Sequence, residues 1–125
     1  MLATSEPVTV EAVRAALASK RFVYCNEKDL HVGIGHVLEA AFPGAVEREV
    51  PITKGSRLDF RVGAVVAVEV KIDGTLSELT RQVYRYAEIE TLAGVVAVVG
   101  RARLRDLPDT MNGKPIAVVH LGGAL

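Results

Sequence analysis

Two charged residues interrupt one of the most apolar stretches of the chain. The run from Val65 to Ile72 is rich in β-branched residues and has neither glycine nor proline, so it predicts a buried strand. Glu69 and Lys71 lie two positions apart in this run. Because side chains on a strand alternate between its faces, both point to the same side. Burying an acid and a base there is costly unless they are paired or bind a ligand.

A second carboxylate comes from the stretch before this strand. Residues 57–62 alternate in character and predict another strand. Its apolar face holds Leu58, Phe60 and Val62, and its polar face holds Arg57, Asp59 and Arg61. Gly63 marks a hairpin that joins the two strands.

The length of this hairpin loop decides what lies opposite Asp59. A loop of three residues after Val62 places Val66 opposite it. Asp59 then lies opposite Glu69, whereas a shorter loop would put a charge on the apolar face, so the hydrophobic pattern selects the longer loop. Two carboxylates repel each other across such a strand pair, and a bound cation would relieve the repulsion.

Two helices are expected before these strands. The first covers Thr9 to Ser19, and the second runs from Asn26 to about Phe42, with Thr9 and Asn26 as N-caps. The apolar stripe of the second helix is Leu30, Ile34, Val37, Leu38 and Ala41. Glu27 lies near the edge of this stripe, so we expect it to face inward in the first turn, where the positive helix end favours a carboxylate.

A third helix follows the central strand. Residues 75–78, Thr-Leu-Ser-Glu, fit a capping box, and the apolar periodicity continues to about Leu92, with Gly94 as the stop. Gln82 lies at one edge of the buried stripe, one turn before Tyr86. Arg81 and Arg85, also one turn apart, are candidates either for a solvated face or for contacts with phosphates.

The remaining elements complete an α/β domain. Further strands are expected over 45–52 and 95–99, the latter parallel to the central strand, with a turn at 53–56. Arg101, Arg103 and Arg105 fall in a loop or short helix. The last strand, 115–121, is expected at a sheet edge because it opens with proline. The predicted order is α-α-β-β-β-α-β-β, with a mixed central sheet flanked by helices.

These residues resemble the signature of a known family. Asp59 followed by Glu69-x-Lys71 is similar to the motif of the PD-(D/E)XK nuclease superfamily, and residues 26–99 resemble its restriction-endonuclease-like core. The run Gln82 to Tyr86 resembles the Gln-x-x-x-Tyr helix motif of the RecB-type branch. Glu27 resembles the acidic residue that archaeal Holliday-junction resolvases carry on the preceding helix. Leu58 stands where the signature has proline.

The resemblance implies a metal-dependent nuclease that acts on DNA. Asp59, Glu69 and the backbone carbonyl of Val70 would hold Mg²⁺ or Mn²⁺, because hard cations take oxygen ligands. The ion would polarise the phosphate and lower the pKa of a bound water. Lys71 would orient that water or stabilise the developing negative charge.

The resemblance also assigns supporting roles. Gln82 would position the water or the lysine, and Tyr86 would support the site from its helix. Glu27 is a possible ligand of a second metal or of its water shell. The expected contacts with nucleic acid are Arg57, Arg81, Arg85 and Tyr86.

Length, charge, cysteine content and hydropathy limit the classes of protein to which the chain could belong. The 125 residues fit a single domain over 1–125, with an N-terminal helical extension at 1–25 and a C-terminal loop and edge strand at 100–125. Fifteen basic and fifteen acidic residues argue against binding of nucleic acid over the whole protein surface but allow a local basic groove. One cysteine, Cys25, is expected to be buried and suits a reducing cytoplasm. No apolar run reaches membrane-spanning length, and no secretion signal is recognisable.

The same residues also allow non-catalytic interpretations. Glu69 and Lys71 could form only a salt bridge with neighbouring strands, and Glu27 could be only a helix-start carboxylate. The chain could then be an inactive nucleic-acid-binding or protein-interaction module with this fold. A structure-selective nuclease is expected to be a homodimer, since two cuts placed by symmetry need two copies. The three histidines lack metal-ligand spacing with a cysteine or a second histidine, so no site is assigned to them.

Overall fold

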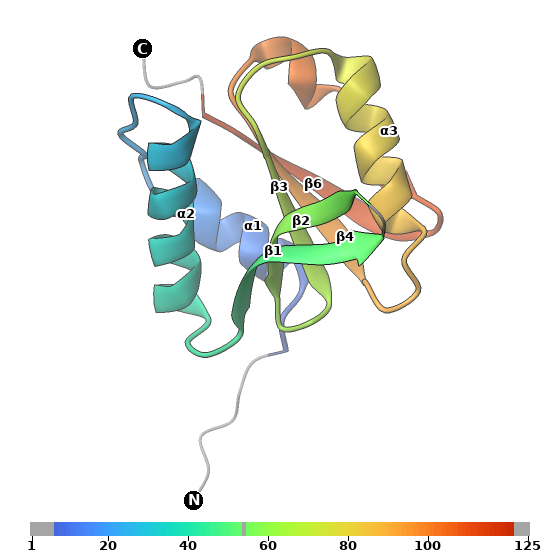
Figure 1. The fold of residues 1–125 in the computed structure, drawn as a ribbon, viewed down its shortest axis with the longest axis horizontal. Coiled ribbons are helices and arrows are strands. Elements are labelled where there is room, and N and C mark those ends of the chain that lie inside the picture. Colours follow the sequence, from blue (N-terminus) through green and yellow to red (C-terminus); the bar gives the residue numbers. More distant parts are fainter. Residues whose placement is uncertain (1–6, 54, 122–125) are drawn as a thin grey trace, which may run out of the picture.

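Six strands form one mixed sheet in the computed structural model, which describes residues 7–53 and 55–121 (Figure 1). Their order across the sheet is β1-β2-β3-β4-β6-β5. The elements are α1 (Val10–Ala18), α2 (Glu27–Ala41), β1 (Val46–Thr53), β2 (Ser56–Val62), β3 (Val66–Lys71), α3 (Leu76–Ala87), β4 (Gly94–Val99), the 3₁₀ helix η1 (Ala102–Arg105), β5 (Thr110–Met111) and β6 (Lys114–His120). The α/β class and the succession of two helices, three strands, one helix and further strands are confirmed.

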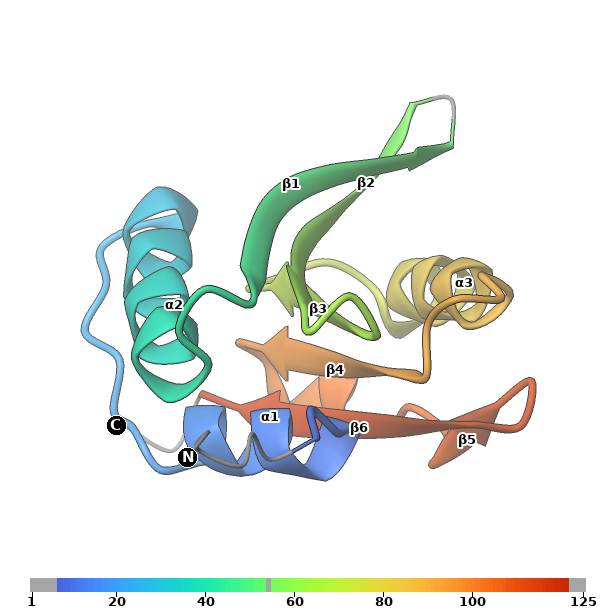
Figure 2. The same cartoon turned by 90° about the horizontal axis from the view of Figure 1, so that it is seen from below.

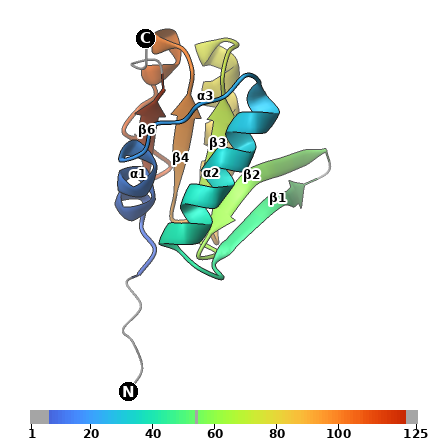
Figure 3. The ribbon, with the colours of Figure 1, turned by 90° about the vertical axis from the view of Figure 1, so that its left-hand side faces the viewer.

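Helices cover both faces of the sheet. Helices α1 and α2 lie on one face and α3 on the other (Figure 3). Strands β3 and β4 are paired in parallel and are buried on both faces, which is why each reads as a nearly continuous apolar run. Their side chains divide between two apolar cores, one beneath α1 and α2 and one beneath α3.

The β2–β3 hairpin has the expected register. Val62 pairs with Val66 and Phe60 with Val68, across a loop of residues 63–65. A positive φ of 61° at Gly63 lets the chain reverse there, and the side chain of Val8 fills the space that a Cβ would need.

The β1–β2 hairpin bends away from the rest of the sheet, as Figure 2 shows. Within β1, Glu49 has a φ of 53° and lies between the pairs Arg48–Phe60 and Val50–Leu58, which places it opposite Asp59, and the register shifts between Pro51 and Thr53. One expectation about this hairpin is corrected. Leu58 does not share a core with Phe60, because it packs beneath α3 while Phe60 packs beneath α2.

Two features differ from the sequence expectation, and a third lies partly outside the described residues. Helix α3 ends at Ala87 rather than near Leu92, because Leu92 leaves the helical path to enter the core below α3. A two-residue strand, β5, was not expected and pairs with the start of β6, so β6 is not the outermost strand where it begins. The predicted turn at 53–56 includes Lys54, which lies outside the described residues.

Two bulk expectations can also be compared with the structure. Cys25 is exposed, contrary to the expectation of burial, because it lies in the linker before α2. No helix in the described part of the chain is long and apolar enough to cross a membrane.

Candidate active site

A cleft of about 480 Å³ opens where β2 separates from β3. Its lining includes every residue that was expected to act in catalysis or to hold a metal ion. They are Glu27 from α2, Asp59 from β2, Glu69, Val70 and Lys71 from β3, and Gln82 from α3. Residues from four elements therefore meet at one solvent-facing end of the sheet.

Asp59 takes the place of a missing strand contact. The antiparallel pairing of β2 with β3 stops at Phe60 and Val68, so the next residue of β3 that points toward β2, Val70, has no backbone partner there. Its N–H instead donates to Oδ2 of Asp59, at 2.8 Å. The N–H and C=O of one strand residue point to the same side, so the Val70 carbonyl also faces the cleft.

Glu69 is the one buried charged residue in the described ranges, with 5% of its surface exposed. Burial, and then the neighbouring charge of Asp59, raises the pKa of Glu69 to about 8, which the Tyr86 hydroxyl and the Lys71 ammonium oppose. Burial also raises the pKa of Asp59, against the effect of the Val70 N–H. The two acids thus crowd each other in a partly dehydrated site, as the repulsion argument predicted.

Tyr86 connects Glu69 to helix α3. Its hydroxyl donates either to Oε1 of Glu69, at 3.1 Å, or to the carbonyl of Arg57, at 3.3 Å, and it accepts from Nε2 of Gln82, at 2.9 Å. Only 1% of Tyr86 is exposed, so the expectation that it contacts nucleic acid is wrong. It can act only through its hydroxyl.

Lys71 closes another side of the cleft. Its side chain passes over Gly74, where a Cβ would lie 2.8 Å from Cε and 3.5 Å from Nζ. Gly74 has a φ of 115°, which also favours glycine. The turn after β3 therefore leaves room for the Lys71 side chain at the edge of the cleft.

Glu27 lines the cleft but does not face inward as expected. The first turn of α2 is exposed, and burial along this helix begins only at Leu30. The Glu27 carboxylate is 58% exposed and lies 3.6 Å from Nε2 of His31, one turn further along.

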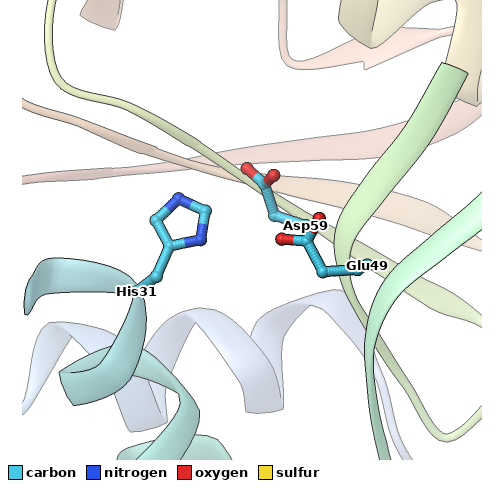
Figure 4. Close-up of side chains that lie close together, drawn as sticks. All are labelled: His31, Glu49 and Asp59. Atoms are coloured by element: carbon cyan, nitrogen blue, oxygen red, sulfur yellow. The ribbon is translucent and has the colours of Figure 1, made fainter. Parts of the chain in front are cut away.

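Two residues beside the cleft, His31 and Glu49, were not expected from the sequence. His31 and Glu49 each offer a ligand atom, and these two atoms and an oxygen of Asp59 all lie within 4.8 Å of one another (Figure 4). Nε2 of His31 is buried and has no hydrogen-bond partner. The position of His31 one helical turn after Glu27 was a usable signal. Glu49 lies opposite Asp59 in the β1–β2 pairing, and this register was not evident from the sequence because it shifts between Pro51 and Thr53.

The three arginines expected to contact nucleic acid are exposed and lie outside the cleft lining. Arg57 pairs with Glu49 at 3.3 Å, Arg81 donates to Oγ of Ser77 at 3.1 Å, and Arg85 donates to Oγ of Ser56 at 3.5 Å. Exposed contacts of this kind contribute little stability and break readily.

The donor set fits a divalent cation. Two carboxylates and a peptide carbonyl are oxygen ligands of the kind that Mg²⁺ and Mn²⁺ take. Among residues 7–53 and 55–121, the ion pairs within 4.0 Å include neither Asp59 nor Glu69, so no side-chain cation neutralises them at close range. The interpretation of Glu69 and Lys71 as a simple salt bridge is not supported by this geometry.

Comparison of the chain with protein-family models, with curated proteins and with solved structures found no match. The chemistry of the cleft therefore has to be inferred from its own groups. Crowded acids, an adjacent lysine and an amide at a solvent-facing cleft can bind a cation and stabilise negative charge on a ligand.

Proposed function

We propose that this protein is a metal-dependent deoxyribonuclease that hydrolyses phosphodiester bonds. The observation that carries the proposal is the cleft where β2 leaves β3, which gathers Asp59, Glu69 and Lys71. The resemblance of these residues to the PD-(D/E)XK signature points the same way. Hydrolysis of a phosphodiester needs charge stabilisation at the phosphate and an activated water, and the cleft offers groups for both.

The metal ligands would be Asp59, Glu69 and the Val70 carbonyl. Asp59 keeps one carboxylate oxygen for this purpose while Oδ2 accepts from the Val70 N–H. A Mg²⁺ or Mn²⁺ ion bound there supplies Lewis-acid polarisation of the phosphate and lowers the pKa of water. Glu69 loses its proton when the ion binds, because the ligand form of a carboxylate is ionised.

Lys71 and Gln82 would act on the substrate side of the site. The Lys71 ammonium balances negative charge that develops on the phosphate or orients the attacking water. The Gln82 amide is held by the Tyr86 hydroxyl at 2.9 Å and can orient the water or the lysine. The hydroxyl also fixes the Glu69 carboxylate, so Tyr86 is a positioning residue.

His31 and Glu49 would extend the ligand set on the other side of Asp59. Their ligand atoms lie within 4.8 Å of each other and of Asp59. Glu27 lies next to His31 and is available for the water shell of an ion. This side offers one nitrogen in addition to oxygens.

The proposal is tested with supercoiled plasmid and end-labelled linear, single-stranded, flapped and four-way DNA, each with Mg²⁺, Mn²⁺ or chelator. Cleavage is expected with metal and not with chelator. Asp59→Asn and Lys71→Ala should lose it, whereas the exposed matched controls Asp109→Asn and Lys28→Ala should keep it. Full activity in either cleft variant would overturn the assignment.

The same panel separates the alternatives. A nucleic-acid-binding module would bind DNA and leave it intact with either metal. A protein-interaction domain would show neither cleavage nor salt-dependent DNA binding. The cleft favours the enzyme, because a binding module has no need of two acids whose ionisation burial opposes.

We also propose that the protein works as a homodimer. A cleft formed by one short chain makes one cut, and paired cuts in a symmetric substrate need two copies related by a twofold axis. Sedimentation velocity across a concentration series should show the dimer, and a monomer at every concentration would refute it.

A further inference from the structure

A second and larger groove lies at the ends of the parallel strands. Its volume is about 770 Å³, and its floor includes Ile72, Gly100 and Leu121, the residues that directly follow β3, β4 and β6. One wall is the linker from α1 to α2, which crosses these strand ends in Figure 3 and contributes Phe22, Val23 and Tyr24. The carboxyl ends of parallel strands are a usual place for ligands in α/β proteins.

This groove is continuous with the candidate active site. Tyr24 and Ile72 line both the groove and the catalytic cleft. At its other end, a smaller cleft of about 270 Å³ shares Arg21, Phe22 and His120 with it. The three hollows therefore lie next to one another along the strand ends.

The groove combines cations with apolar and aromatic surface. Arg21 and Arg101 line it, and Lys20 lines the cleft beyond it. The described lining of the groove contains no acid, and Asp73 of the adjoining catalytic cleft pairs with Arg101 at 3.6 Å and with Arg103. Both members of the Asp73–Arg101 pair are more than half exposed, so the pair is weak and the guanidinium is free to turn toward a phosphate.

Val23 provides a further indication that the groove has an occupant. It is 94% exposed, the highest value among the large apolar residues that the structure describes as exposed. With Phe22 and Tyr24 on either side, it places three apolar side chains in succession beside the arginines. A ligand with flat apolar faces and a negatively charged backbone would be complementary to both components.

We propose that this groove holds a single strand of nucleic acid that leads to or from the catalytic cleft. Single-stranded binding surfaces combine a positive groove that follows the phosphates with aromatic side chains on which bases stack. A duplex hides its base faces inside the stack, so it cannot use the aromatic wall. This inference rests on the proposed function and narrows its substrate to DNA or RNA with a single-stranded segment.

The test measures binding in chelator, where no metal-dependent cleavage takes place. Fluorescence anisotropy compares a labelled single-stranded DNA, an RNA of the same sequence and the corresponding duplex. The wild-type protein should bind a single strand at least about tenfold more tightly than the duplex. The DNA and RNA arms decide which sugar the groove accepts.

Two pairs of variants locate the binding surface. Arg101→Glu should weaken single-strand binding and make its salt dependence shallower, whereas Arg105→Glu, the same charge change at an exposed arginine outside the groove lining, should have a much smaller effect. Tyr24→Ala should weaken binding about fivefold or more, the size expected for one lost base-stacking contact. Tyr24→Phe keeps the ring and should retain the affinity.

The outcomes separate this inference from the proposed function. Equal single-strand affinity in the Arg101 and Arg105 variants, or tighter binding to duplex than to single strand, overturns the groove. Loss of binding in the groove variants, together with no cleavage in Mg²⁺ or Mn²⁺, supports single-strand binding in the groove and overturns the proposed nuclease activity.

Discussion

The Asp59 carboxylate accepts a hydrogen bond from the Val70 N–H at 2.8 Å, in the place where a strand partner would otherwise be. The Asp59 side chain therefore has two roles. It satisfies a peptide group of a buried strand, and it brings a carboxylate next to Glu69. Structure and proposed chemistry can be separated at this residue, because different substitutions remove different parts of its role.

Asp59→Asn should keep the fold and lose the activity. The amide oxygen can still accept from the Val70 N–H, but the charge that binds a cation is gone. Metal-dependent cleavage should fall at least about a hundredfold with little change in melting temperature. Asp59→Ala should in addition lose about 1–3 kcal/mol of stability, because it leaves the Val70 N–H without an acceptor. Denaturant unfolding of the two variants makes the comparison, and equal stabilities would contradict the structural role.

Glu69 should make the metal-free protein less stable as the pH rises. Its pKa is about 8 in the folded protein, against 4.5 for an unperturbed glutamate, so the folded state keeps a proton that the unfolded state releases. This contribution is complete below pH 4.5 and is lost as the pH rises through about 8. Unfolding of the wild type and of Glu69→Gln in chelator, from about pH 5 to about pH 9, measures this contribution. The free energy of unfolding of Glu69→Gln should therefore rise relative to that of the wild type as the pH increases.

Mg²⁺ should reverse this trend in the wild type. Binding of the ion requires the ionised carboxylate, so the stabilisation by metal should grow as the pH approaches 8. Glu69→Gln should show no such growth. A stabilisation by Mg²⁺ that is independent of pH in the wild type would argue that Glu69 is not a ligand.

Tyr86→Phe should affect both stability and catalysis. The substitution removes the hydroxyl that contacts Glu69 and Gln82 and leaves the buried ring in place. We expect a loss of about 1 kcal/mol in the free energy of unfolding, with a several-fold decrease in kcat. Tyr84→Phe on the same helix is the control, because Tyr84 is 50% exposed and should tolerate the change. A pH–rate profile that shifts only in Tyr86→Phe would identify a positioning role through Glu69.

Thr75→Ala should destabilise helix α3, which carries Gln82 and Tyr86. The Thr75 hydroxyl accepts from the Glu78 N–H at 3.1 Å, and the Glu78 carboxylate accepts from the Thr75 N–H at 3.1 Å. Removing the cap should cost about 1 kcal/mol, and Thr75→Ser should restore most of it. Thermal unfolding of the two variants is sufficient, and an unchanged melting temperature in Thr75→Ala would count against the cap.

Much of the local structure could be predicted because it depends on neighbours in the chain. The caps at Thr9, Asn26 and Thr75 each hold a hydrogen bond within three residues. The β2–β3 register followed from a short loop and from the alternation of apolar residues, since a slip by one residue would expose one face and bury charge on the other. The placement of Asp59 near Glu69 came from that register.

Other features depend on packing between distant segments, so no local pattern could reveal them. The end of α3 at Ala87 depends on where Leu92 finds room in the core, and β5 exists only because the chain returns beside β6. The exposure of Glu27 depends on which elements cover the start of α2, whereas the burial of Tyr86 agrees with its place in the apolar stripe of α3.

The sequence by itself determined the α/β order, the strand that carries Glu69 and Lys71, and the register that brings Asp59 beside them. The physical reason is that hydrogen bonds in caps and tight turns, and the period of a strand, are fixed by residues close together in the chain. Only the tertiary structure decided that Leu58 and Phe60 enter different cores and that His31 lies close to Glu49 and Asp59. These placements depend on how the sheet packs against α2 and α3, and such packing between distant segments is not encoded in any single stretch.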